Sequence, residues 1–200
     1  MKKSSILLLL SLFMGLAAHQ TALAQAADLR FATRLDCATN RYLATIQIRS
    51  SGATSFSIGT SSIFVNYAPA SLSYVSYQSA NFSPVNLCIN GTTPSWDQHM
   101  VSGNMAGMFN LTMTLLNATG SCPGVATGWV DVGTLTFAVL NPLGNPLLAF
   151  DPAYTSFNTV PDNNGAQTIP PGTFTGVDRG GALNCAACGP CLTITTNRLR

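Results

Sequence analysis

The sequence contains no glutamate, and its only two lysines, Lys2 and Lys3, lie among its first three residues. Charged residues make up 8% of the 200 residues, whereas a soluble domain carries about 25%. These absences exclude Schiff-base lysines, glutamate acid–base pairs and metal sites built on glutamate. After the two lysines, seven arginines balance seven aspartates, so residues 25–200 carry no formal net charge. Such a chain lacks the basic footprint that nucleic-acid binding requires.

Residues 1–24 have the pattern of a secretory signal peptide. Lys2 and Lys3 form a positive start, residues 6–18 an apolar core, and Ala22-Leu23-Ala24 a small-x-small cleavage site. The apolar core is too short to cross a bilayer as a helix, and Gln25 rather than cysteine follows the predicted cut. We therefore predict an exported protein with no permanent membrane anchor, located outside the cell, at its surface or in the periplasm.

All six cysteines follow the predicted leader, and an even number in an exported chain favours disulfides. They are Cys37, Cys88, Cys122, Cys185, Cys188 and Cys191. Six cysteines allow fifteen complete pairings, and the spacing alone does not choose among them. We favour Cys88–Cys122, because both lie in turn-rich segments beside the same apparent strand pair, and a structural disulfide cluster near the C-terminus.

Residues 25–178 read as short strands separated by turns rich in Pro, Gly and Asn. Apolar residues alternate with polar ones in four segments, a period that is typical of strands with one buried face. No segment after the leader repeats apolar residues at helical spacing. The buried residues predicted from this alternation are Tyr42, Ala44, Ile46 and Ile48; Ile63, Val65 and Tyr67; Phe109, Leu111, Met113 and Leu115; and Leu135, Phe137 and Val139.

The pattern predicts an all-β protein with a single sandwich domain over residues 25–178, followed by a short Cys-rich tail over residues 179–200. Two shorter strands are expected within residues 147–150 and 172–177. Residues 72–77 read as a strand with apolar residues on both faces, so its facing is ambiguous, and Tyr74 and Tyr77 are expected on opposite faces.

Two of these strand segments carry a family resemblance. Residues 63–77, IFVNYAPASLSYVSY, resemble a strand that ends in a Tyr-x-Pro turn and is followed by a Leu-led strand. Residues 132–139, VGTLTFAV, resemble the later Gly-x-Leu-x-Phe-x-Val strand, and residues 147–157 have the spacing expected next. The chain thus resembles the cohesin-like and carbohydrate-binding-module sandwiches of secreted bacterial proteins, including those of Bacteroidetes type. The resemblance implies a jelly-roll module that binds dockerins, polysaccharide or surface proteins and catalyses nothing.

Two motifs suggest catalysis, but their surroundings favour structural interpretations. Cys188-Gly-Pro-Cys191 matches the thioredoxin redox motif, yet it lies near the end of the chain without the βαβ context that the chemistry needs. Cys185 completes a triple C-x2-C spacing, but no fourth metal ligand accompanies it. His99 follows Asp97 at the spacing W-D-Q-H, but no G-x-S-x-G nucleophile elbow occurs. We interpret His99 as a surface-loop histidine and predict no catalytic residue.

The aspartates give no stronger sign of a site. Residues 162–165, Asp-Asn-Asn-Gly, depart from the alternating oxygen ligands of a calcium loop, and Asn-Gly is a turn signal by itself. Asp131 and Asp151 form no recognisable pair, although a hydrolase built on aspartates and His99 is kept as a third hypothesis. We predict no metal site and no cofactor.

The aromatic residues are the candidates for ligand contact, because exposed rings can stack on sugars at little cost in entropy. We select Trp96, placed in a polar loop, together with Tyr77 and Tyr74. Trp129 shares the parity of Leu135 and is expected in the core, unless a bulge at Gly133 inverts its facing. The predicted function is non-catalytic recognition of a glycan or a secreted or surface protein; the alternative is a structural or adhesive subunit.

Overall fold

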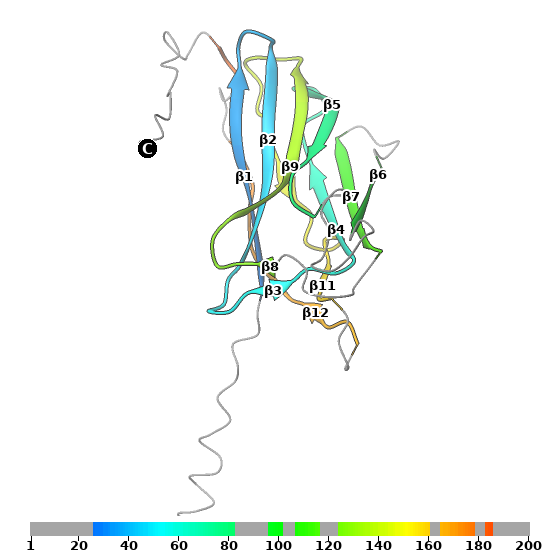
Figure 1. The fold of residues 1–200 in the computed structure, drawn as a ribbon. Helices are drawn as coiled ribbons and strands as arrows, with labels where there is room; N and C mark the ends of the chain where they lie inside the picture. Colours follow the sequence, from blue (N-terminus) through cyan, green and yellow to red (C-terminus); the bar gives the residue numbers. More distant parts are fainter. Residues whose placement is uncertain are drawn as a thin grey trace, which may run out of the picture.

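The computed structural model describes residues 26–82, 96–101, 107–116, 124–160, 165–178 and 183–185, with residues 98–101 described by their backbone only. Within these ranges the chain consists of strands and turns, without a helix, and none of it could cross a membrane as a helix. Two β-sheets pack face to face (Figure 1). The single all-β sandwich expected from the sequence is confirmed.

The larger sheet has five strands in the order β13-β1-β2-β9-β5. Their bounds are β1 Ala27–Asp36, β2 Arg41–Ser50, β5 Leu72–Ser79, β9 Val130–Val139 and β13 Pro171–Thr175. Neighbours pair antiparallel except β1 and β13, which are parallel. The sheet thus joins the first and last strands of the described chain side by side.

The smaller sheet has four strands in the order β10-β4-β7-β6, all antiparallel. Their bounds are β4 Ser61–Asn66, β6 Trp96–Val101, β7 Met108–Leu115 and β10 Ala149–Phe150. Two further strand pairs close one end of the sandwich (Figure 1), β3 Phe56–Ser57 with β8 Gly124–Val125 and β11 Phe157–Asn158 with β12 Thr168–Ile169.

The core lies between the two sheets and is built from the alternating residues that the sequence indicates. On β2 every second residue from Tyr42 is buried, and on β7 the buried residues are Phe109, Leu111 and Met113. Tyr67 packs on Phe137 with its ring centroid 5.1 Å away. The burial of these residues confirms the predicted inward facing of the strands. Burying one apolar face of each sheet is the main gain on folding.

Two β-bulges reverse the alternation where the sequence pattern alone is ambiguous. In β9, Val132 is an extra residue, since Ile46 pairs with Gly133 and Gln47 with Asp131. In β5, Val75 is the extra residue, and its side chain is 44% exposed. A bulge shifts the residues beyond it to the other face. These two positions decide where the candidate aromatic residues point.

The parallel pair β1–β13 is held by a buried carboxylate. The ladder shifts where Gly172 and Thr173 together oppose Asp28. Asp28 is 4% exposed; its Oδ1 accepts the Thr173 backbone N–H at 2.8 Å, and its Oδ2 accepts Arg49 Nε at 3.0 Å. A Cβ at position 172 would lie 2.3 Å from Asp28 Oδ1, so glycine is required there. The carboxylate thereby fixes both the last strand and an arginine on the outer surface.

Candidate functional site

Trp96 is the first residue of β6, so the prediction that it lies in a loop is wrong. Its side chain is 0% exposed, its Nε1 donates to the Ile58 carbonyl at 3.3 Å, and its ring meets Phe82 edge-on at 5.5 Å. The indole therefore has no surface face on which a ligand could stack. The polar sequence around Trp96 concealed a strand whose first residue enters the core.

Tyr74 and Tyr77 lie on the same face of β5, which corrects the expected opposite facing. The bulge at Val75 turns both rings toward Phe109, at centroid distances of 5.7 Å and 6.0 Å. Tyr77 also donates its hydroxyl to the Val132 carbonyl at 3.1 Å. Both side chains are half-buried and belong to the margin of the core. That they contact a ligand stays a prediction.

We expect the stability of the fold to decrease in alkaline solution. Burial raises the pKa of Tyr42, Tyr74 and Tyr77 above 10, and Tyr74 raises that of Tyr77 further. Because the folded state favours the neutral phenols, the raised pKa values add to the free energy of unfolding. This contribution is complete below the tyrosine pKa of the unfolded chain. It is lost as the pH rises above about 10 toward the folded values. Urea unfolding measured from pH 8 upward should show this decrease.

The matched control is Tyr77→Phe, which removes one titrating phenol from the same ring position. This variant should lose less stability between neutral and alkaline pH than the parent protein, although it lacks the hydrogen bond to Val132 at both. An unfolding free energy that stays constant through the tyrosine titration, or an equal slope in the two proteins, would contradict the assignment.

One disulfide lies in the described part of the chain, and it joins Cys37 to Cys185. Cys37 lies in the turn between β1 and β2, and Cys185 follows Leu183, whose side chain is fully buried. Part of the predicted tail is therefore packed against the sandwich. Cys88, Cys122, Cys188 and Cys191 lie outside the described residues, so the Cys88–Cys122 pairing stays a prediction.

The residues considered for catalysis are not brought together in the described part. Asp131 lies on β9 and accepts Gln47 Nε2 at 2.6 Å, while Asp151 follows β10 in the other sheet and accepts the Ala153 N–H at 3.0 Å. His99 lies on β6 rather than in a loop, and its side chain is outside the description. Among the described residues, no three His, Cys, Asp or Glu side chains gather as metal ligands. Of residues 162–165 only Gly165 is described.

The outer surface of the four-stranded sheet combines aromatic and uncharged polar side chains. Phe64 on β4 packs against Tyr154, with a centroid distance of 5.5 Å, and Tyr154 is 64% exposed. Residues that share this surface are Ser62, Asn66, Asn110, Thr112 and Thr114, in the register of the ladder. We call this surface, with Phe64, Tyr154 and Ala149, the aromatic face.

Tyr154 is held in place by a turn that is bonded to β4. The Asp151 N–H donates to the Phe64 carbonyl at 3.0 Å, and the Thr155 hydroxyl accepts the Phe64 N–H at 3.1 Å. The Thr155 N–H also closes the turn on the Asp151 carbonyl at 2.9 Å. A ring presented by such a fixed backbone loses little freedom when it binds a partner.

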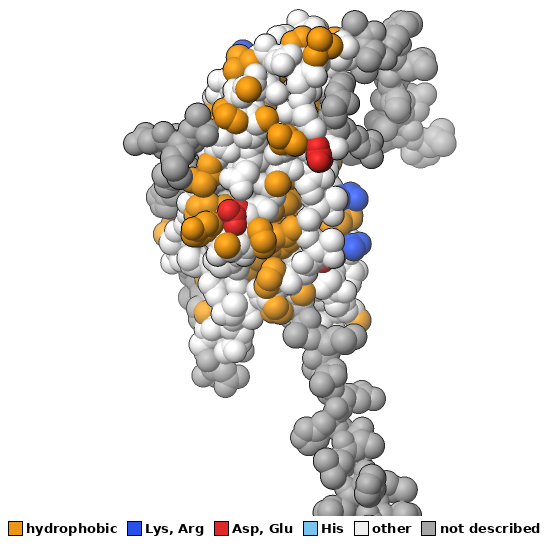
Figure 2. All heavy atoms as spheres, turned by 180° about the vertical axis from the view of Figure 1, so that it is seen from behind, with side chains coloured by type: hydrophobic (Ala, Val, Ile, Leu, Met, Phe, Trp, Pro, Cys, Tyr) orange, Lys and Arg blue, Asp and Glu red, His pale blue; other side chains and the backbone are white. Residues whose placement is uncertain are grey.

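Charge is divided between the two sheets. All four described arginines, Arg30, Arg34, Arg41 and Arg49, lie on β1 and β2. Figure 2 shows the molecule from behind, where hydrophobic side chains gather with acidic groups among them, while the basic side chains lie at the margins of the view. The described charges on or beside the smaller sheet are Asp97, Asp151 and Asp178. The aromatic face is therefore acidic at its edges.

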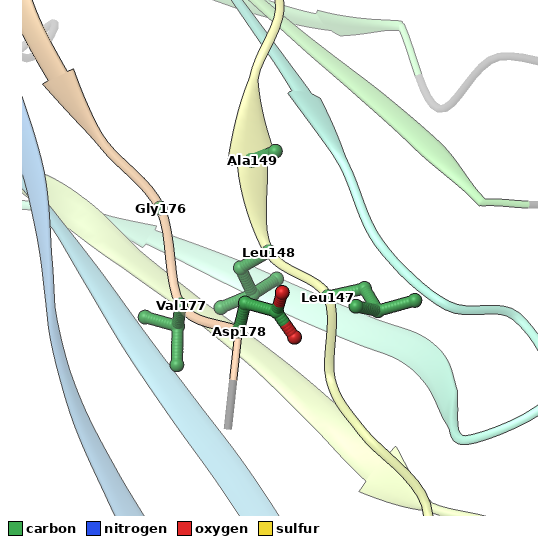
Figure 3. A pocket seen from close by; sticks show the side chains of 6 residues that line it. All are labelled: Leu147, Leu148, Ala149, Gly176, Val177 and Asp178. Carbon is green, nitrogen blue, oxygen red and sulfur yellow. The ribbon is translucent and has the colours of Figure 1, made fainter. Parts of the chain in front are cut away.

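A shallow hollow of ≈ 320 Å³ borders this face, between the chain leading into β10 and the chain leaving β13 (Figure 3). The Leu148 and Val177 backbones exchange two hydrogen bonds, and the Asp178 carboxylate accepts the Asn145 amide. Leu147 is exposed with φ at 46°, a conformation that costs a branched residue energy. The hollow is lined by Leu147, Leu148, Ala149, Gly176, Val177 and Asp178.

Trp129 lies at the outer surface of the five-stranded sheet, because the bulge at Val132 and Gly133 inverts its facing. The expectation that Trp129 is a core residue is wrong, because the bulge at Gly133 that would invert its facing is present. Its ring is half-buried beneath two guanidiniums, with Cζ of Arg30 4.2 Å and Cζ of Arg49 4.6 Å from the ring centroid. Sequence reasoning missed this cluster, since only the bulge reveals it.

Comparison with known proteins identifies the fold but not a sequence family. The chain matches no family model and no curated protein. The seventh ScaB type I cohesin of Pseudobacteroides cellulosolvens has a similar structure, with a TM-score of 0.52 and 10% identity over 74% of this chain and 87% of the cohesin. CaCohA2 of Clostridium acetobutylicum has a TM-score of 0.52 and 14% identity over 79% of this chain and 93% of CaCohA2. A third similar structure is the sixth cohesin of Acetivibrio cellulolyticus scaffoldin B, solved with a Cel5 dockerin mutant. It has a TM-score of 0.51 and 10% identity over 75% of this chain and 94% of the cohesin. These likenesses show a cohesin-like sandwich.

Proposed function

We propose that this chain is a non-catalytic recognition module that binds a protein partner on the aromatic face. The observation that carries the proposal is the exposed Tyr154 ring, fixed over Phe64 by a turn bonded to β4. Aromatic anchors contribute a large part of the energy of protein interfaces, most of all when they are held in place before binding. The location proposed for this work is outside the cell, as the leader-like residues 1–24 suggest.

The partner that we propose is a small domain of dockerin type with a basic surface. The fold is that of cohesins, and one of the similar cohesins was solved in complex with a dockerin. The charges beside the aromatic face, Asp97, Asp151 and Asp178, complement a partner rich in Lys or Arg. Such complementarity speeds association and selects among partners more than it adds affinity.

The test measures binding of purified dockerin domains to the intact protein by calorimetry. Tyr154→Ala should weaken binding about 30-fold or more, the loss expected for a central aromatic anchor. Leu143→Ala is the control, because Leu143 is 78% exposed in the loop between β9 and β10 and is not one of the residues of the aromatic face. Asp151→Asn should slow association at low salt and have little effect at high salt.

Three outcomes would overturn the proposal. The first is that no dockerin binds at any salt concentration. The second is that Tyr154→Ala and Leu143→Ala bind with equal affinity. The third is that binding is retained by Tyr154→Ala and lost by a variant of the opposite sheet, which would transfer recognition to that sheet.

A further inference from the structure

A second surface, on the opposite sheet, carries two arginines whose side chains are held in position through their Nε atoms. Arg30 donates from Nε to Gln47 Oε1 at 2.7 Å, and Gln47 donates in turn to Asp131 at 2.6 Å. Arg49 donates from Nε to the buried Asp28 at 3.0 Å. Both guanidiniums also lie against the Trp129 ring. We call these residues the Arg–Trp cluster.

The contacts that hold the two arginines leave their outer nitrogens available. Within the described part of the chain, the Nη groups of Arg30 and Arg49 make no hydrogen bond. A guanidinium held through Nε and stacked on an aromatic ring has already lost much of its rotational freedom, while its planar pair of donors still fits a carboxylate. The cluster is thus organised to bind a planar anion.

We propose that the Arg–Trp cluster binds the carboxylate groups of an extended acidic polysaccharide, with chains of uronic acid as the ligand class. Next to the cluster, the outer surface of the sheet offers neutral hydrogen-bonding groups on β2 and β9. Thr45 and Thr134 lie side by side with their hydroxyls 2.8 Å apart, and Gln47 of the cluster is the next residue on the same face of β2. Carboxylate contacts at the cluster and hydroxyl contacts beside it match a sugar chain laid along this surface.

The charge balance of the cluster separates this ligand from other anions. Asp28 and Asp131 offset the two arginines, so the cluster attracts through local hydrogen bonds rather than a strong long-range field. Nucleic-acid binding depends on such a field and is not favoured here. A protein interface surrounds its Arg and Trp anchors with apolar contacts that exclude water, but the strip between Arg49 and Arg41 on β2 offers only Leu43 among threonine and glutamine. This surface is separate from the aromatic face.

The experiment is calorimetric titration of the intact protein with oligogalacturonate, and with a neutral hexasaccharide of equal length as the ligand control. Arg30→Gln should lower the affinity about 10-fold or more, because hydrogen bonds between charged groups are lost. Arg30→Lys should also lose most of the affinity, since an ammonium cannot replace the planar fork. Trp129→Ala should weaken binding and remove the fluorescence response to the ligand, whereas Trp96 is buried and should give none.

Arg34→Gln is the matched control, because Arg34 is exposed on the same strand and face but does not contact Trp129. It should bind within about 2-fold of the parent protein, since distant charges are largely screened. Equal losses in Arg34→Gln and Arg30→Gln would overturn the proposal in favour of unspecific charge attraction. Absence of binding at low salt, or equal binding of the neutral sugar, would overturn it too. Tyr154→Ala should leave this binding unchanged, which keeps the test separate from that of the protein partner.

Discussion

Replacing Trp96 by alanine should lower the free energy of unfolding by about 3–5 kcal/mol, the range for removing a large aromatic side chain from a core. The indole is fully buried, packs edge-on against Phe82 and donates to the Ile58 carbonyl, so the variant loses packing and leaves a buried carbonyl unpaired. A loss of this size is a large part of the stability of a typical domain. Urea denaturation followed by circular dichroism measures it.

Two controls separate the packing of Trp96 from its hydrogen bond and from surface effects. Trp96→Phe keeps most of the ring and should cost distinctly less than Trp96→Ala. Leu143→Ala lies at an exposed position and should change stability by no more than about 0.5 kcal/mol. A Trp96→Ala protein that is as stable as the parent but fails to bind a ligand would restore the surface role that the sequence suggested.

The contrast between Trp96 and the confirmed strands shows what sequence patterning can predict here. Strands β2, β4, β7 and β9 have long period-two alternation, and burying one face of a sheet requires that pattern. Trp96 begins a strand whose next three residues are polar, Asp97-Gln98-His99, so no period-two alternation marks it. The fold was therefore predictable from its longest amphipathic strands, while a strand whose sequence lacks that alternation was not.

The candidate sites depend on bulges and long-range packing, which a sequence does not display. One extra residue at Val75 puts Tyr74 and Tyr77 on one face, and one at Val132 turns Trp129 outward. Gly133 hinted at the second, and the structure gives its reason: a Cβ there would lie 2.2 Å from the Tyr77 hydroxyl. Likewise, the aromatic face needs Phe64 and Tyr154 from segments 90 residues apart. Their contact follows only from the folded sandwich.

The Cys37–Cys185 disulfide shows the same limit, because fifteen pairings were open and the two cysteines are 148 residues apart in sequence. The disulfide joins two segments that are each also fixed by local contacts. At the β1–β2 turn, Asp36 accepts the Thr39 hydroxyl at 2.7 Å and the Ala38 N–H at 3.1 Å, and the Thr39 hydrogen bond lowers the pKa of Asp36. On the other side, Leu183 is fully buried two residues before Cys185.

Removing this disulfide in a Cys37→Ala/Cys185→Ala protein should cost about 2–5 kcal/mol, toward the upper end because the closed loop is long. The double variant is preferable to a reducing agent, which would also act on the other four cysteines. If the bond holds Leu183 in the core, Leu183→Ala should cost about 2–5 kcal/mol in the parent and clearly less in the double variant, since a released segment no longer uses that side chain. Equal costs of Leu183→Ala in the two proteins, measured by urea unfolding, would show that Leu183 stays in the core without the disulfide.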